Sequence, residues 1–197
     1  MSLYELVKRF ARNITLLLRN ASKRVQLYPL GLRAHSSTSI AWSVSVDAGG
    51  SGCRVRVGSC TTLDVGVILR AYGGYIEIGE YCSINPYCVL YGGGVIKIGN
   101  GVRIAPHTVI VASNHIFDDA TRFIHQQGET SKGILIEDDV WIGAGVRILD
   151  GVIIRKGTVV GAGAVVTKST ECYAVVVGVP AKQISSRITR EVAQNKL

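Results

Sequence analysis

The chain has 197 residues and a mass of 21.1 kDa, which suits one domain with a modest appendage. Its residues are 47% hydrophobic, and this excludes an intrinsically disordered chain, which combines low hydrophobicity with high charge. The formal net charge of +8 is unevenly distributed, and most of it lies at the N-terminus.

Residues 1–33 differ in kind from the rest of the chain. They carry one acidic residue, Glu5, and seven basic residues, a net +6: Lys8, Arg9, Arg12, Arg19, Lys23, Arg24 and Arg33. Apolar residues recur at steps of three and four from Leu3 to Leu18, which predicts an amphipathic helix. We expect this segment to cap the first turn of the fold that follows, because an exposed strand edge invites aggregation. Contact with anionic lipid is the main alternative, and the two roles are compatible. Nucleic acid is disfavoured as a partner, because the rest of the chain has no basic, aromatic surface.

A six-residue repeat dominates the remainder. In its most regular part, aliphatic residues stand at every sixth position, namely Ile136, Ile142, Ile148, Ile154, Val160 and Val166. A second track of small or β-branched residues follows four positions later, at Val140, Val146, Val152, Thr158 and Ala164. A period of six fits neither a helix nor an ordinary strand. It predicts a triangular coil in which each hexad forms one short side.

The same register extends upstream in groups of three, at Val57, Leu63, Leu69, Ile78, Ile84, Leu90, Ile98, Ile104 and Ile110. Groups of three are what a three-sided coil requires, and they predict about five coils. A partial coil before them, near Ile40 and Val46, is a further possibility. The interruptions all follow the third hexad of a coil, so they should stack along one edge of the prism.

The longest interruption, residues 112–133, is too polar and too long to be a corner, and excursions of this length are usually functional. His115 lies at its root. A neutral imidazole held there by a rigid coil can accept a proton from a hydroxyl group, although His115 could instead only cap a turn. We expect His107 to lie at a corner or on the surface, and His125 on the surface of the loop.

The five cysteines, Cys53, Cys60, Cys82, Cys88 and Cys172, show no metal-binding spacing. Cys82 and Cys88 fall on the small-residue track and should face inward. Scattered thiols in odd number, with no signal peptide, indicate the reducing cytosol.

Several motifs now carry a family resemblance: the hexads, NHxF at Asn114 to Phe117, DDVWIGAGVRIL at Asp138 to Leu149, VVGAGAVVTK at Val159 to Lys168 and GVPAK at Gly178 to Lys182. Over roughly residues 55–184 the chain resembles the hexapeptide-repeat O-acetyltransferases. The nearest branch comprises the galactoside and maltose acetyltransferases and the capsule and O-antigen acetyltransferases. The basic N-terminal segment lies outside the resemblance.

The resemblance implies an all-β fold, a left-handed parallel β-helix, which departs from the right-handed crossover rule. It also implies a homotrimer with active sites between neighbouring prisms, acetyl-CoA as the donor, and no metal. In the implied site, His115 is the general base, Asn85 holds the acceptor hydroxyl, and Tyr87, Tyr91 and Asn114 contact the sugar. The residues implied to bind the donor are Trp141, Ala144, Ala162, Gly163, Thr167, Lys168 and Lys182.

We therefore expect a cap over residues 1–33, a β-helix over 34–184 and a C-terminal helix over 185–197. The expected reaction is direct acetyl transfer to a sugar hydroxyl of a surface polysaccharide or its precursor, on the cytoplasmic side of the membrane. An N-acetyltransferase acting on an amino or nucleotide sugar is the alternative. A γ-class carbonic anhydrase, which needs three zinc-binding histidines, and a non-catalytic scaffold are the remaining possibilities.

Overall fold

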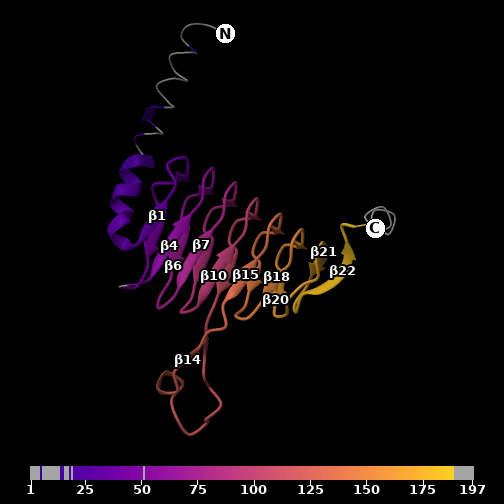
Figure 1. The fold of residues 1–197 in the computed structure, drawn as a ribbon. Helices are drawn as coiled ribbons and strands as arrows, with labels where there is room; N and C mark the ends of the chain where they lie inside the picture. The colour runs from indigo at the N-terminus through magenta and orange to yellow at the C-terminus, as the bar shows by residue number, and fades with distance from the viewer. Residues whose placement is uncertain (1–4, 6–13, 16–17, 19, 51, 189–197) are drawn as a thin grey trace.

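The structure is a computed structural model that describes residues 5, 14–15, 18, 20–50 and 52–188. Much of the amphipathic pattern predicted for residues 1–33 lies outside the described residues. The described chain winds into a prism of parallel strands, from which one long loop projects (Figure 1). This is the predicted left-handed parallel β-helix.

Three sheets form the faces of the prism. The first sheet contains β1 (Leu32–Ala34), β4 (Arg54–Val57), β7 (Tyr75–Ile78), β10 (Val95–Ile98), β15 (Ile134–Ile136) and β18 (Ile153–Ile154). The second contains β2 (Ser39–Ile40), β5 (Thr62–Leu63), β8 (Ser83–Ile84), β11 (Arg103–Ile104), β16 (Trp141–Ile142), β19 (Val159–Val160), β21 (Ala174–Val177) and β22 (Lys182–Ser186). The third contains β3 (Ser45–Asp47), β6 (Ile68–Arg70), β9 (Val89–Tyr91), β12 (Val109–Val111), β17 (Arg147–Ile148) and β20 (Val165–Val166). The excursion holds β13 (Asn114–His115), β14 (Glu129–Thr130) and the 3₁₀ turn η2 (Ile124–Gln126).

The core is a stack of aliphatic side chains from successive coils. Ile104, for example, pairs in register with Ile84 of the preceding coil and Ile142 of the next, and all three are fully buried. Every position of the predicted aliphatic track from Val57 to Val166 is buried, as are Val140, Val146, Val152, Thr158 and Ala164 of the second track. The six-residue period is therefore confirmed as the pattern that builds the interior.

Hydroxyl and thiol groups on the second track also tie neighbouring coils together. Thr61 Oγ1 donates to the carbonyl oxygen of Gly79 at 2.8 Å, and Thr108 Oγ1 to that of Gly143 at 3.1 Å. Cys82 and Cys88 occupy equivalent positions and are buried, with Sγ atoms 3.1 Å from carbonyl oxygens of the next coil. The expectation that these two thiols face inward is confirmed.

The number of coils is one more than the five that the repeat indicated. The described residues form six complete coils, because β1, β2 and β3 close a full first coil where a partial one was anticipated. The sequence pattern did not reveal the first side of this coil, because Ala34, the partner of Val57, is smaller than the aliphatic residues that mark the repeat. Ile40 and Val46 form its other two sides and are buried.

A helix over residues 20–27, followed by the 3₁₀ turn η1 (Tyr28–Leu30), packs on this first coil (Figure 1). Asn20 and Leu27 are buried. Asn20 Oδ1 accepts from the Ile40 backbone N–H at 3.2 Å, and Arg24 donates to the Thr38 carbonyl oxygen at 3.0 Å. These contacts cover part of the open end of the second sheet. The strand β1 begins at Leu32, before the predicted start of the β-helix at residue 34.

The C-terminal end corrects a second prediction. A helix was expected from Ser185, but Ser185 and Ser186 belong to β22, which pairs antiparallel with β21. This short, mostly polar segment has no pattern that distinguishes a strand from a helix, and the unpaired edge of β21 decides the outcome. The rest of that prediction, residues 189–197, lies outside the described residues.

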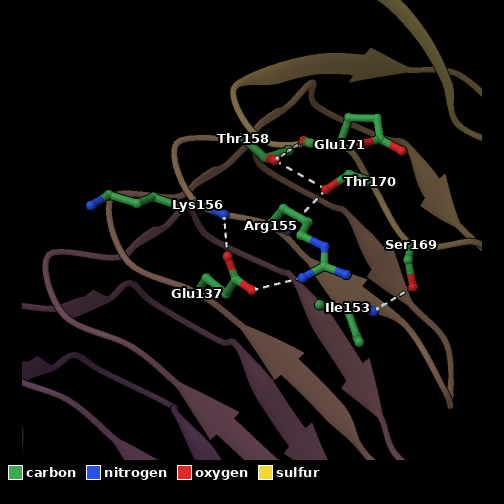
Figure 2. A network of polar contacts seen from close by, with 8 residues as sticks. All are labelled: Glu137, Ile153, Arg155, Lys156, Thr158, Ser169, Thr170 and Glu171. Carbon is green, nitrogen blue, oxygen red and sulfur yellow. Dashed lines mark hydrogen bonds and ion pairs between the residues drawn. The ribbon is translucent and has the colours of Figure 1, made fainter. Parts of the chain in front are cut away.

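The last strand of the first sheet is closed by side chains (Figure 2). The backbone N–H groups of Ile153 and Arg155 donate to the hydroxyl oxygens of Ser169 and Thr170 at 2.9 and 3.0 Å. Each would otherwise point to an empty neighbouring position in the sheet. Hydroxyl groups thus replace a seventh strand on this face. Among the described helical residues, no segment is long and apolar enough to cross a membrane.

Candidate active site

The three edges of the prism carry different chemistry. We call the corners between the second and third sheets the second edge, and those between the third and first sheets the third edge. The excursion, residues 112–133, leaves the third edge between β12 and β15. The shorter connections 71–74 and 92–94 lie on the same edge, so the prediction that the insertions share one edge is confirmed.

The root of the excursion is held firmly at both ends. At its start, Ala112 is buried and its N–H donates to the Tyr91 carbonyl oxygen at 2.9 Å. At its end, the Asp150 carboxylate accepts from the backbone N–H groups of Lys132 and Gly133 at 2.9 and 2.8 Å. A two-stranded antiparallel ladder joins β13 to β14 between these anchors. The loop tip is exposed, but its base is part of the scaffold.

A depression of about 490 Å³ opens beside this root, and its walls are Tyr72, Tyr91, Gly93, Val111, Ser113, Asn114, His115 and Glu129. It brings together three of the predicted site residues, His115, Asn114 and Tyr91. The rings of Tyr72 and Tyr91 meet edge to face, with centroids 5.3 Å apart and planes at 76°. Aromatic faces beside hydrogen-bonding side chains can hold a sugar ring.

His115 is presented to solvent rather than used in packing. Its side chain is 61% exposed, and its Nδ1 atom lies 3.6 Å from Oε1 of Glu129. Both properties suit a proton acceptor, which must reach the substrate and keep a defined ring orientation. Sequence reasoning did not anticipate Tyr72 or Glu129 here.

A second group of predicted residues lies on the second edge. Asn85, Ala144, Ala162 and Gly163 occupy corner positions there in the third, fifth and sixth coils, and the Gly163 N–H donates to the Ala144 carbonyl oxygen at 2.8 Å. Ala144, Ala162 and Gly163 are exposed, and a side chain at Gly163 would meet open space. Small residues thus leave the backbone accessible along this edge.

Tyr87 is also on the second edge, where its exposed ring stacks on that of His107 at 5.4 Å between centroids. Within one chain it therefore does not share the depression with Tyr91. His107 has the positive φ of a corner residue, as predicted, and His125 is exposed on the excursion.

The remaining donor candidates flank these positions. Trp141 is 56% exposed on β16 of the second sheet, and Lys182 begins β22 of the same sheet. Thr167 and Lys168 are exposed and follow β20 onto the third edge. One chain thus places the predicted acceptor base and most of the predicted donor surface on different edges. Within the described residues, no three His, Cys, Asp or Glu side chains gather as a metal site would require.

Comparison with known proteins agrees with this architecture. Residues 133–168 match the sequence profile described as bacterial transferase hexapeptide (six repeats). The chain is 32% identical over 143 residues to WbbJ of Escherichia coli K12, a protein named for O-acetyl transfer in lipopolysaccharide biosynthesis. That alignment covers 66% of this chain and 70% of WbbJ. This chain is also 34% identical over 125 residues to a galactoside O-acetyltransferase of Lactococcus lactis, and that alignment covers 54% of this chain and 60% of that enzyme.

The chain spans about half the length of several other curated relatives that it matches. Among solved structures, a mutant form of the N-acyltransferase AntD from Bacillus cereus, in complex with dTDP and coenzyme A, has a TM-score of 0.70 at 25% identity. The match covers 88% of this chain and 94% of AntD. Repeat, fold and sequence similarity converge, and the chain belongs to the bacterial hexapeptide-repeat transferase family.

Proposed function

We propose that the protein is an acetyl-CoA-dependent O-acetyltransferase that acts on a sugar hydroxyl, of a surface polysaccharide or its precursor, with His115 as the general base. The observation that carries the proposal is the exposed imidazole of His115 in a depression walled by two tyrosine rings. The lipopolysaccharide context in the name of WbbJ supports the choice of acceptor class.

The chemistry requires one proton transfer and no covalent enzyme intermediate. Acetyl-CoA, when bound, supplies an acetyl group activated as a thioester. His115 accepts the proton of the acceptor hydroxyl while the new C–O bond forms and the C–S bond breaks, and the imidazolium then returns the proton to the leaving thiolate. Tyr91 and Asn114 orient the acceptor within the depression, and Asn85 would hold its hydroxyl.

The second edge and the second sheet have properties that fit the donor. The backbone at Ala162 and Gly163 is unobstructed and can pair with the amide groups of a pantetheine chain. Trp141 offers an exposed apolar surface, and Ala144 leaves only a backbone N–H to stabilise an oxyanion. Lys182 on the second sheet, with Thr167 and Lys168 on the third edge, would lie toward the phosphates, where cations are favourable.

We further propose a homotrimer, because the separation of the two half-sites on one chain requires a neighbouring copy. The third edge of one prism, with His115, would face the second edge of the next, with Asn85 and Ala144. A closed threefold arrangement creates three equivalent sites of this kind. Sedimentation equilibrium of the full chain measures the oligomeric state, and a stable monomer with full activity would contradict it.

An N-acetyltransferase of an amino or nucleotide sugar is the second candidate. AntD was solved with dTDP and coenzyme A, and a further relative at 29% identity is named a dTDP-4-amino-4,6-dideoxy-D-glucose acyltransferase. The same imidazole could remove a proton from an ammonium group. A screen of acetyl-CoA consumption against sugars, amino sugars and nucleotide sugars separates the two candidates.

The decisive variant is His115→Ala, with His125→Ala as the matched control, because His125 is an exposed histidine on the same excursion. Loss of a general base lowers kcat by about 10²–10⁴-fold, whereas the control should retain wild-type turnover. Undiminished acetyl transfer by His115→Ala would rule out the proposed mechanism.

The basic N-terminal segment extends the proposal to a location at the cytoplasmic face of a membrane. Within this segment, Val25 and Tyr28 are exposed at 73% and 57%, and Trp42, in the first coil, is exposed at 67%. Exposed apolar groups beside cations favour an anionic lipid surface. Replacing Lys8, Arg9 and Arg12 by glutamine should reduce sedimentation of the full chain with anionic liposomes, while neutral liposomes bind neither form. Equal binding of both forms to anionic liposomes would contradict this location.

A further inference from the structure

The ladder at the root of the excursion sets His115 directly opposite Glu129. The two are Cα partners in the antiparallel pair β13–β14, and Asn114 pairs with Thr130 beside them. Directly opposed residues in such a ladder have Cβ atoms about 4.5–5.5 Å apart, so the backbone itself brings the two side chains together. The Nδ1–Oε1 distance of 3.6 Å follows from this register.

We propose that Glu129 is a positioning residue that turns the His115 ring so that Nδ1 carries its proton and Nε2 accepts the proton of the acceptor. This inference rests on the proposed function of His115 as a base. An ionised carboxylate can only accept hydrogen bonds, so the ring nitrogen that faces it must be the protonated one. In the neutral ring the other nitrogen then holds the free electron pair.

The pair has little value as a device for stability. The side chains of His115 and Glu129 are 61% and 52% exposed, and ion pairs in such positions contribute little to folding because water screens them. Glu129 is also the only acidic residue among the described residues that line the depression. Its position is better explained by an effect on the ring it faces, which grows when substrate excludes water from the site.

A direct contact of Glu129 with the substrate is the competing role, and kinetics separate the two. A residue that binds substrate equally in the ground and transition states changes KM, whereas a residue that orients the base changes kcat. For Glu129→Gln we expect kcat to fall about 10- to 100-fold, as is typical when a group that orients a functional histidine is lost. The KM for the acceptor should stay within about twofold.

Glu129→Asp should recover part of kcat, because it restores a carboxylate on a shorter side chain. Asp118→Asn is the matched control, since Asp118 is an exposed acidic residue of the same excursion, and it should retain wild-type kinetics. A rise in KM with unchanged kcat in Glu129→Gln would overturn the proposal in favour of substrate binding. Unchanged kcat and KM would overturn it as well.

A spectroscopic readout tests the proposal without relying on turnover. Long-range ¹H–¹⁵N spectra of the histidine-labelled full chain report which ring nitrogen is protonated, and His115→Asn identifies the signals of residue 115. We expect the Nδ1–H form in the wild type and a shift toward Nε2–H in Glu129→Ala. If the wild-type ring is already in the Nε2–H form, the proposal is wrong even if the protein transfers acetyl groups. Loss of turnover in His115→Ala is read separately and bears on the proposed function alone.

Discussion

The hydroxyl oxygens of Thr158 and Thr170 lie 3.0 Å apart, and both residues are buried. Thr170 Oγ1 also accepts from the Arg155 backbone N–H, and Thr158 Oγ1 lies 3.1 Å from the Glu171 carbonyl oxygen (Figure 2). The pair fastens the final turn to the last complete coil. The hydroxyl group of Thr170 occupies the place where a further strand of the first sheet would otherwise bond to the backbone of β18 and Arg155.

Thr170→Val should therefore destabilise the protein by about 1–3 kcal/mol, because it leaves the part-buried N–H of Arg155 and the buried hydroxyl of Thr158 without a hydrogen-bond partner in Thr170. The free energy of unfolding from urea titration measures the effect. Thr62→Val is the control, since Thr62 is exposed on β5, and it should change stability by less than about 0.5 kcal/mol. Equal stability of Thr170→Val and the wild type would show that the network contributes nothing.

The sequence predicted the coil far better than the site. The aliphatic period could be read because a buried side of the prism tolerates only a narrow range of side chains, from Val57 to Val166. The position of Glu129 could not be read in the same way. Its register with His115 depends on how the excursion folds back on itself, and no repeat constrains that path.

The short elements at the two ends of the β-helix were harder to predict from the sequence for a related reason. Ala34 fills an aliphatic position with a single methyl group, so the first coil looked incomplete. β22 has no apolar alternation, since all five of its residues are exposed, and it is a strand because β21 offers it an edge. Tertiary context decides such segments, and local pattern does not.

Two glycines with nearly the same backbone conformation should respond differently to substitution. Gly66 has φ +71° and Gly145 has φ +68°, but an added Cβ would overlap the Tyr87 ring at Gly66 and meet open space at Gly145. Gly145→Ala should cost about 1–2 kcal/mol from backbone strain alone. Gly66→Ala should cost more, because the Tyr87 ring must also leave its stack on His107.

A double-mutant cycle isolates this clash. If Tyr87 is the obstacle, Gly66→Ala should cost no more in a Tyr87→Ala background than Gly145→Ala does in the wild type. Thermal unfolding of the four variants supplies the comparison. A penalty at Gly66 that persists without the ring would assign it to another cause.

The buried cysteines make stability sensitive to alkaline pH. Burial raises the pKa of the Cys82 and Cys88 thiols above the ordinary value of 9.0. The folded state then holds these protons more tightly than the unfolded state. Their contribution is complete below pH 9.0 and is lost as the pH rises through the higher folded-state pKa values.

Stability should therefore fall as the pH rises above 9.0, and fall less in a Cys82→Ala, Cys88→Ala variant. At pH 8, Cys60 and Cys172, which are exposed, should react rapidly with a thiol reagent, whereas Cys82 and Cys88 should react only on unfolding. Rapid reaction of all five thiols in the native protein would contradict the packing described for the second track.

Asp150 should control the order of the excursion. Its carboxylate accepts both backbone N–H groups at the point where the loop returns to β15. Asp150→Ala removes this anchor, so hydrogen exchange in residues 129–133 should accelerate while exchange in β16 and β17 stays slow. Asp47→Ala, which removes a similar carboxylate bonded to Gly49 in the first coil, is the control and should leave the excursion unchanged. Unaltered exchange in Asp150→Ala would mean that the β13–β14 ladder suffices to hold the loop.

Among the described residues, every connection that varies in length lies on the third edge of the prism. The connections on the other two edges have the same length in every complete coil. A connection on the third edge can be lengthened, shortened or exchanged without any strand changing its partner. The fold therefore tolerates exchange of its loops, and a foreign loop could be grafted between Val111 and Ile134 without changing the pairing of the strands on either side.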